Sequence, residues 1–467
     1  MTLSLCALFL VALGLAFAPR SVQAYSCTFT STEPSNDFSL PANWTDCGGS
    51  APSSTDDILI PMGEIAELTV LSNEVNNAHV SGTLLGTNKN LAVHGSTYID
   101  LTGFVTSTSG LFNFNGATFR NDGLVGTNSG TIVNNNVGTN NGTIDVGAGQ
   151  FNTWLLTNSG TVNGGSGLIR MDAYGASWVN TGAGVLNPQV GTVRVGGIAV
   201  QQLPFPTLYN LHIPSGPGGI FTTGTVITNT LTIDAGGALH ADAYDVDVFG
   251  AGTNAINGTF DTDSGSIVFA TGTTAIVGTL ESLGSGHILI ESGTFSIDPG
   301  GVVTSTSGSL VFQVPFTSAG EIGNSTGDIW FQAAFVNGGT VNLGSGTATA
   351  TAAVNNTGGT FNGGSSTFVI MDDFSGGTFN PQTGLVHFQT PGSSIQMSDF
   401  HDILFSGGVS YTMTNPSYTV TGSVEVATGT SLLLMSDTGL SVAGRFIVAG
   451  TFNLQSGHAT TTGDFII

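Results

Sequence analysis

One short motif recurs along this chain at a nearly constant interval. The motif is Gly-Gly-Thr-φ-Asn, where φ is Val or Phe, and its threonines are Thr340, Thr360 and Thr378, so the steps are 20 and 18 residues. Thr, Val and Phe favour a pleated, half-buried strand, whereas Gly accepts positive φ and Asn tolerates it at corners. A step near this length with such corners is typical of a β-solenoid.

Related segments carry the pattern through most of the chain: Asn128–Val133, Asn141–Val146, Asn158–Asn163, Asn257–Phe260, Ser292–Ile297 and Gly450–Leu454. A coil of this length holds two or three strands, and successive coils stack about 4.8 Å apart, so we expect asparagines at equal positions to form hydrogen-bonded ladders. We predict an all-β fold, a single elongated right-handed parallel β-helix (β-solenoid) with a small N-terminal cap. Expected strands include Ala78–Leu85, Leu91–His94, Ser96–Leu101, Gly130–Val133 and Leu168–Met171.

The composition is strongly acidic. The chain has 467 residues, of which 69 are Gly, and its 30 acidic residues face only six Lys and Arg, giving a net charge of −24. Nucleic acid and anionic membranes are poor partners for such a chain, because phosphate binding requires clusters of Lys and Arg. The charge suits solubility in a salty or acidic medium, or binding of divalent cations and of cationic or neutral glycan surfaces.

Residues 1–24 are typical of a secretory signal, with an apolar run from Leu3 to Ala18 and small residues near Ala24, although no Lys or Arg precedes the run. The run is too short for a good membrane span, so we expect none after cleavage. Cys27 and Cys47 then remain as a pair in an exported chain, and a disulfide is the default expectation; two unrelated buried thiols are the alternative.

Residues 25–70 differ in composition from the repeats. They contain Asn43-Trp44, Pro52, Asp56-Asp57 and the line Ile60-Pro61-x-Gly63. This N-W…P-x-x-x-D-D-φ-φ-I-P-x-G pattern resembles the start of secreted bacterial surface proteins with parallel β-helix repeats. The resemblance implies that residues 25–70 cap a solenoid formed by residues 71–467, and a cap is also what an open sheet edge requires.

The sequence also contains a duplication much longer than one coil. Similar segments begin at Thr161 and at Thr360. Each continues to an Asn-Pro-Gln sequence and then to a segment with aromatic residues, which gives a super-repeat over about 161–270 and 360–467. Repeats of this form also resemble large secreted bacterial surface proteins.

Few residues suggest catalysis. Hydrolysis of a polysaccharide requires two carboxylates with separated pKa values. Asp372 and Asp373 are the best candidates, but alternation along a strand would place them on opposite faces. We therefore assign no catalytic residue, and exposed carboxylates at strands or corners are the simpler interpretation.

Metal and histidine motifs are equally sparse. Asp261 and Asp263 begin like a calcium loop, but Gly272 occupies the position where such a loop needs a Glu. Weak Ca²⁺ binding and solvated loop carboxylates are the two interpretations; we assign no metal site and no other cofactor. The eight histidines are scattered and form no zinc motif.

The sequence leaves three functional hypotheses. The first is a non-enzymatic secreted or cell-surface protein that binds extracellular proteins or polysaccharides through its sheet faces. The second is a polysaccharide-degrading β-helix hydrolase or lyase, and the third is a spacer. The chain stops within a coil pattern at Thr460–Ile467, which suggests end-to-end self-association or a shortened chain.

Overall fold

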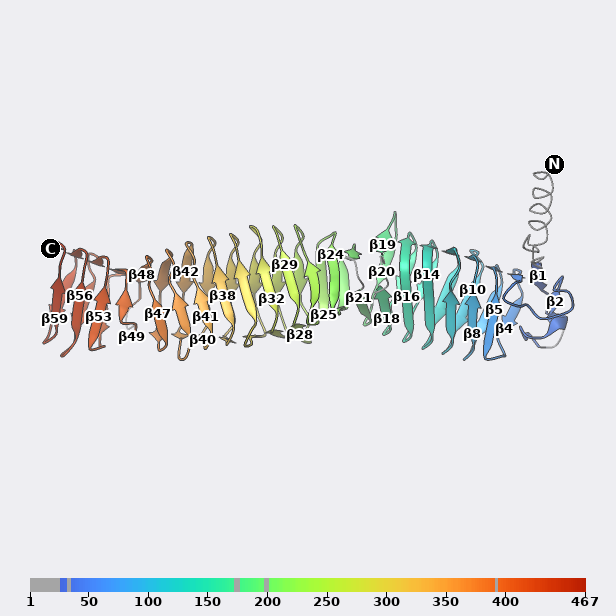
Figure 1. The fold of residues 1–467 in the computed structure, drawn as a ribbon, viewed down its shortest axis with the longest axis horizontal. Coiled ribbons are helices and arrows are strands. Elements are labelled where there is room, and N and C mark those ends of the chain that lie inside the picture. Colours follow the sequence, from blue (N-terminus) through green and yellow to red (C-terminus); the bar gives the residue numbers. More distant parts are fainter. Residues whose placement is uncertain (1–25, 32–34, 172–176, 197–200, 391–393) are drawn as a thin grey trace, which may run out of the picture. The chain divides into compact units, whose positions relative to one another are not determined.

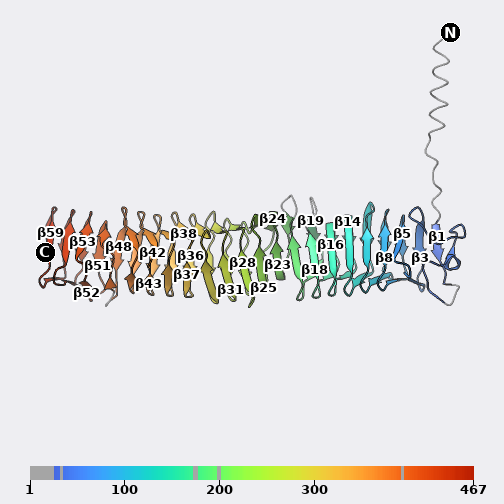
Figure 2. The ribbon, with the colours of Figure 1, turned by 60° about the horizontal axis from the view of Figure 1, so that its bottom comes forward.

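The computed structural model describes residues 26–31, 35–171, 177–196, 201–390 and 394–467. The expected signal segment 1–24 and Asp172 lie outside these residues. Apart from one 3₁₀ turn, η1 (Pro41–Asn43), the elements of the described residues are β-strands. The chain divides into two compact units, unit 1 up to Val137 and unit 2 from Gly138. In each unit, strands of successive coils lie side by side (Figures 1 and 2).

Unit 1 has three rows of strands. The row that contains His79 comprises β1 (Ser26–Phe29), β3 (Asp57–Ile60), β6 (Ala78–Val80), β9 (Thr97–Ile99) and β12 (Thr118–Asn121). A second row comprises β4 (Ile65–Glu67), β7 (Thr83–Gly86), β10 (Phe104–Ser107) and β13 (Leu124–Thr127). The third comprises β5 (Ser72–Val75), β8 (Asn90–Val93), β11 (Leu111–Phe114) and β14 (Thr131–Asn140), the strand within which the two units divide. These pairings are all parallel.

The first residues of unit 1 cover the open edges of its first coil. β1 pairs in parallel with β3, and β2 (Trp44–Thr45) pairs antiparallel with β1. Asp37 forms a parallel bridge to Glu67 of β4. Trp44 is buried, packs edge-on against Phe29, and donates its indole N–H to the carbonyl of Phe38 at 2.7 Å. Cys27 of β1 and Cys47 form the predicted disulfide.

Unit 2 is built on the same plan, and we name its rows after one member each. The Thr340 row comprises β22 (Gln201–Leu203), β24 (Gly216–Phe221), β26 (Gly237–His240), β29 (Thr259–Thr262), β32 (Thr279–Ser282), β35 (Val302–Ser305), β38 (Glu321–Asn324), β41 (Thr340–Asn342), β44 (Thr360–Asn362) and β47 (Thr378–Asn380). A separate sheet comprises β50 (Asp399–Phe400), β53 (Ser417–Val420), β56 (Gly439–Val442) and β59 (His458–Thr461).

The Trp330 row comprises β27 (Val246–Val248), β30 (Ile267–Phe269), β33 (Ile288–Ile290), β36 (Leu310–Phe312), β39 (Ile329–Phe331), β42 (Thr347–Ala350), β45 (Thr367–Ile370), β48 (Leu385–Phe388), β51 (Asp402–Phe405), β54 (Val424–Val426), β57 (Phe446–Val448) and β60 (Phe465–Ile466).

The Phe316 row comprises β18 (Leu168–Met171), β21 (Thr192–Val195), β23 (Thr207–Ile213), β25 (Thr225–Ile233), β28 (Thr253–Ile256), β31 (Thr273–Ile276), β34 (Thr294–Ile297), β37 (Phe316–Ser318), β40 (Phe335–Asn337), β43 (Val354–Asn355), β46 (Phe374–Ser375), β49 (Ser394–Ile395), β52 (Ser410–Met413), β55 (Ser431–Leu434) and β58 (Thr451–Leu454). β15 (Thr143–Asp145), β17 (Thr161–Asn163) and β20 (Val185–Asn187) form a further line, and β16 (Gln150–Asn158) pairs with both β18 and β19 (Ser177–Asn180).

The predicted motif step is confirmed by the strand register. Thr340 pairs with Thr360, and Thr360 pairs with Thr378, on neighbouring strands. The expected asparagine ladder is also present: Asn362 donates to Asn342 at 2.7 Å, and Asn380 donates to Asn362 at 2.8 Å. Both units are therefore parallel β-solenoids, as the sequence predicted.

The core follows from alternation along the strands. Inward positions hold Val, Ile, Leu and Phe, and alternate with outward positions that are half-buried or exposed. In unit 2 the inward phenylalanines stack both between and within coils: the ring centroids of Phe316 and Phe335, on neighbouring coils, are 4.3 Å apart, and those of Phe331 and Phe335, on consecutive strands of one coil, are 5.0 Å apart. Such offset stacking adds to the free energy of burial.

The two copies of the super-repeat share their corners. Gln189 and Gln382, in the two Asn-Pro-Gln lines, both adopt positive φ, and each is followed by a glycine that donates to the preceding proline carbonyl. The copies nevertheless lie in different rows, because β18 belongs to the Phe316 row and its counterpart β45 to the Trp330 row. Equivalent sequence therefore faces different directions.

One strand expectation needs correction. Ala78–Leu85 is not one strand, because β6 ends at Val80 and β7 begins at Thr83. Gly82 lies in the turn between them, where an added Cβ would meet the carbonyl oxygen of Pro61 at 2.2 Å. The glycine therefore marks a corner at which two coils come very close.

Candidate functional site

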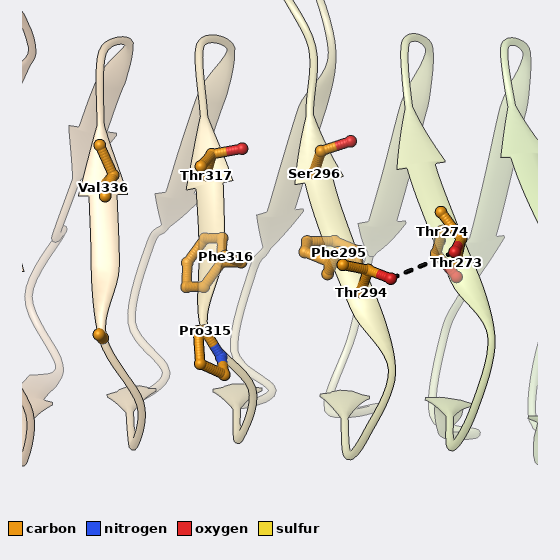
Figure 3. Close-up of a pocket in the computed structure, with 10 residues that line it drawn as sticks. Thr273, Thr274, Thr294, Phe295, Ser296, Pro315, Phe316, Thr317 and Val336 are labelled. Atoms are coloured by element: carbon orange, nitrogen blue, oxygen red, sulfur yellow. Dashed lines mark hydrogen bonds between the residues drawn. The ribbon is translucent and has the colours of Figure 1, made fainter.

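A groove lies on the outer face of the Phe316 row, across strands β31, β34, β37 and β40 (Figure 3). Its volume is about 370 Å³. Its lining residues are Thr273, Thr274, Thr294, Phe295, Ser296, Pro315, Phe316, Thr317, Ala334 and Val336. The groove therefore combines apolar surface with several hydroxyl groups.

The groove exists because large and small residues alternate in register. The inward column contains Phe295, paired with Phe316, at 3% and 4% exposure. The outward column beside it contains only small or β-branched residues, since Ser296 pairs with Thr317 and Thr317 with Val336. Side chains this short leave a hollow between them, and the two buried phenylalanine rings lie beneath it.

The outward column of the Trp330 row is apolar over several coils. Val268, Leu289 and Val311 are aligned in register and half-buried, and the column continues through Trp330 to Thr349 and Val369. Trp330 has 37% of its surface exposed. A short turn joins β39, which carries Trp330, to β40, which carries Val336 of the groove.

The coils between residues 299 and 371 carry little charge. Between Asp298 and Asp372 the only charged residues are Glu321 and Asp328, in a chain whose net charge is −24. Glu321 accepts a hydrogen bond from Asn342 in the Thr340 row, and Asp328 accepts one from the backbone of Thr347. We call residues 299–371 the uncharged belt.

A different kind of cluster lies on the Thr340 row. His240, Asp261 and Glu281 occupy one outward column on neighbouring strands. The Nδ1 atom of His240 lies 2.9 and 2.8 Å from the two carboxylate oxygens of Asp261, which is only 6% exposed. This column brings an imidazole and two carboxylates together on one sheet face.

Both carboxylates of this column have perturbed pKa values. Burial raises the pKa of Asp261, and the hydrogen bond and charge of His240 offset only part of that effect. Burial also raises the pKa of Glu281, and the negative charge of Asp261 raises it further. Raised carboxyl pKa values are a feature of catalytic acids and also of crowded structural acids.

Unit 1 has a polar cluster of its own on the His79 row. His79, Tyr98 and Arg120 are stacked in register on β6, β9 and β12. Arg120 lies 5.2 Å from the Tyr98 ring centroid and forms a 2.8 Å ion pair with Asp122. Asp100 is 2.9 Å from His79. His79 and Arg120 lie on either side of the Tyr98 ring and come from the two adjacent coils, so this cluster connects successive coils.

Hydrogen bonds set the pKa values in this cluster. The hydroxyl of Ser81 donates to Asp100 and lowers its pKa, burial opposes that effect, and His79 and Tyr98 lower the pKa further. The hydroxyl of Tyr98 donates to Asp100 and Asp122, which raises the pKa of the phenol. The pKa of Asp100 in unit 1 is therefore shifted in the opposite direction from those of Asp261 and Glu281 in unit 2.

Four histidines pair with a carboxylate one coil away. The pairs are His79–Asp100, His94–Glu74, His212–Asp234 and His240–Asp261, with nitrogen-to-oxygen distances of 2.8 to 3.3 Å. Their sequence separations are 20 to 22 residues, which is one coil. The interpretation of these histidines as scattered missed this pattern, although the coil step was already known and could have revealed it.

The weak candidates of the sequence occupy separate places. Asp261 points to His240 on the strand face, whereas Asp263 is exposed in the following turn. Asp372 and Asp373 are both exposed in the bend between β45 and β46, so the alternation argument does not apply to them. Among the described residues, no group of three His, Cys, Asp or Glu side chains is arranged to hold a metal ion.

A second hollow of about 440 Å³ lies further along the Phe316 row, across β21, β23 and β25. Its polar groups bond mainly to one another: His212 lies 2.8 Å from Asp234, and Asn210 accepts hydrogen bonds from Asn229 and Thr230. This hollow therefore offers fewer available groups to a ligand than the groove does.

Comparison with known proteins gives no family assignment: no family model matches the sequence, and no curated protein matches it. In the described part of the chain, no helix has both the length and the apolar character of a membrane span.

Proposed function

We propose that this protein is a secreted or cell-surface β-solenoid with a structural and adhesive role, which binds extracellular partners or glycans through the outer faces of its rows. One observation carries the proposal. In the uncharged belt, outward side chains of neighbouring coils form apolar and hydroxyl-bearing columns that face solvent, around Trp330 and Val336. Exposed apolar surface of this kind marks binding sites.

The N-terminal segment supports the same role. Trp44, the disulfide and the paired edge of β3 lie where the sequence resembles the cap of secreted bacterial surface proteins. Covering an edge prevents uncontrolled pairing of strands and leaves the outer faces as the surfaces for binding.

A polysaccharide-degrading enzyme is the second candidate. The observation in its favour is the column of His240, Asp261 and Glu281, because two carboxyl groups on adjacent strands are the groups that glycoside hydrolysis needs. In this candidate Glu281 would donate the proton and Asp261 would act as base or nucleophile.

One experiment separates the two candidates. The purified protein is passed over neutral and acidic polysaccharides, and both its retention and the length of each polymer are measured. Retention without shortening is expected. Any shortening of a polymer would overturn the adhesive role. If the shortening disappears in Glu281→Gln, the reaction takes place at this column; if it persists in this variant, the reaction takes place elsewhere. Absence of both retention and shortening would overturn glycan binding and leave a protein partner.

A further inference from the structure

We infer that the groove of the Phe316 row binds a single chain of a neutral polysaccharide. This inference rests on the proposed function and names the ligand class and the place where it binds. It depends on three properties of the groove, which are its size, its surface chemistry and its lack of charge.

The size of the groove suits one polymer chain. Four strands at about 4.8 Å and about three residues of each strand at about 3.3 Å give a face of roughly 19 by 10 Å. Its area, about 190 Å², is far below the ~800 Å² that each partner buries in a stable protein interface. The volume of about 370 Å³ lies within the range of small-ligand pockets. A second copy of this chain or a folded partner would need much more surface.

The chemistry of the groove matches a sugar ring. A pyranose presents an apolar C–H face and a rim of hydroxyl groups, and the groove presents the exposed apolar side chains of Pro315 and Val336 together with the hydroxyls of Ser296 and Thr317 (Figure 3). Thr294 and Thr273 already share a hydrogen bond of 3.1 Å, which fixes one wall. A mostly apolar lining with a few placed polar groups is typical of small-ligand sites.

A further apolar column lies on the outward side of the Trp330 row. Ala334 and Val336 line the groove, and Trp330 lies one short turn earlier in the same coil. Val311 pairs with Trp330 in the adjacent coil, so the apolar surface continues along the row. A polymer, which presents the same apolar face repeatedly, matches a surface that repeats with each coil.

Charge selects a neutral polymer. Five of the ten residues that line the groove lie in the uncharged belt and none of the ten is charged, whereas the chain as a whole carries −24. An acidic polysaccharide would meet repulsion from the chain and would find no cation among the lining residues. A cationic polymer would gain more from the acidic residues outside the belt. A neutral polysaccharide meets neither the repulsion nor the competing attraction.

The test measures binding of neutral cello- and manno-oligosaccharides, and of a galacturonate oligosaccharide of matched length, to the purified protein by calorimetry. Val336 is 44% exposed, so Val336→Asp places a charge at the groove without disturbing the core. Val179→Asp is the matched control, because Val179 is also 44% exposed and lies in unit 2, outside the groove. Thr317→Trp fills the groove without adding charge.

We expect a neutral oligosaccharide to bind, Val336→Asp to weaken its affinity about tenfold or more, and the control to change it less than about twofold. Thr317→Trp should also abolish binding, with an unchanged melting temperature. Equal binding by all variants would exclude the groove and leave the adhesive function intact. Two results would overturn the assignment of a neutral ligand but not the adhesive function. One is preferential binding of the galacturonate, and the other is no binding of either neutral oligosaccharide while the polymers are still retained.

Discussion

Unit 1 and unit 2 have the same three-row coil but present different outer faces. On the His79 row of unit 1, imidazole, phenol, guanidinium and carboxylates are hydrogen-bonded from coil to coil. In the uncharged belt of unit 2, the outward columns of the Trp330 and Phe316 rows are apolar or hydroxyl-bearing, and the stacking occurs inside, between phenylalanine rings. The comparison teaches that the inward columns maintain the coil, whereas the outward columns are free to differ and so carry specificity.

The largest expected effect concerns the core of unit 2. Phe361 is fully buried and contacts the rings of Phe368 and Phe374. Phe361→Asp should destabilise unit 2 by about 4 kcal/mol or more, because it leaves both a cavity and a buried charge. Hydrogen exchange should show lost protection in unit 2 and little change in unit 1, because coils stabilise mainly their neighbours.

Val336→Asp serves as the control for this prediction, because it adds the same charge at an exposed position of the same unit. An unchanged melting temperature for Phe361→Asp would contradict the assignment of Phe361 to the core. Equal loss of protection in both units would show that the solenoid unfolds as one cooperative body.

The second effect belongs to unit 1. Cys27 and Cys47 close a loop with a sequence separation of 20 residues, so replacing both with Ala should cost unit 1 about 3 kcal/mol. Urea denaturation monitored by hydrogen exchange should reveal earlier opening of the first coils. Replacing both cysteines in the Phe361→Asp background tests independence: the two losses should add, and a strong deviation from additivity would show that the units are coupled.

The smallest effect is an opposite response to acid. Asp261 and Glu281 in unit 2 have raised pKa values, so their protonated forms favour the folded state; their contribution is greatest below the ordinary values of 3.8 and 4.5 and is lost as the pH rises through the higher folded values. Asp100 in unit 1 has a lowered pKa, so its contribution is present above 3.8 and is lost as the pH falls through the folded value.

Hydrogen exchange between about pH 3 and pH 6, corrected for intrinsic rates, measures both responses. Acidification should weaken protection around β9 in unit 1 and strengthen it around β29 and β32 in unit 2. Glu281→Gln should reduce the response of unit 2 alone, and Asp100→Asn that of unit 1 alone. A change of the same sign in both units would contradict the opposite shifts.

Much of the fold was predictable because it depends on one-dimensional periodicity. The Gly-Gly-Thr-φ-Asn step gave the register of Thr340, Thr360 and Thr378 and the ladder of asparagines. The Cys27–Cys47 disulfide was predictable because these two cysteines are the pair that remains after the expected signal segment is removed. These features require only that equal positions in successive coils meet, which the sequence states directly.

The groove was not predictable in the same way. It depends on which short outward side chains lie beside Phe295 and Phe316, and coil lengths vary enough that this alignment needs the strand register. Asp372 and Asp373 show the same limit, since alternation applies to strands and they lie in a bend. The pairs such as His79–Asp100 were within reach of the sequence, because their spacing equals the coil step.

The coil-to-coil register has an evolutionary consequence. Each outward column contains one residue from each coil. Duplication of a single coil therefore adds one residue to every column and leaves the existing residues unchanged. Under the proposed function, the number of binding positions grows with copy number, and avidity rises with that number without any improvement of the individual contact. Lineages could tune how strongly such a protein holds a polymer by unequal recombination, with no substitution in the groove.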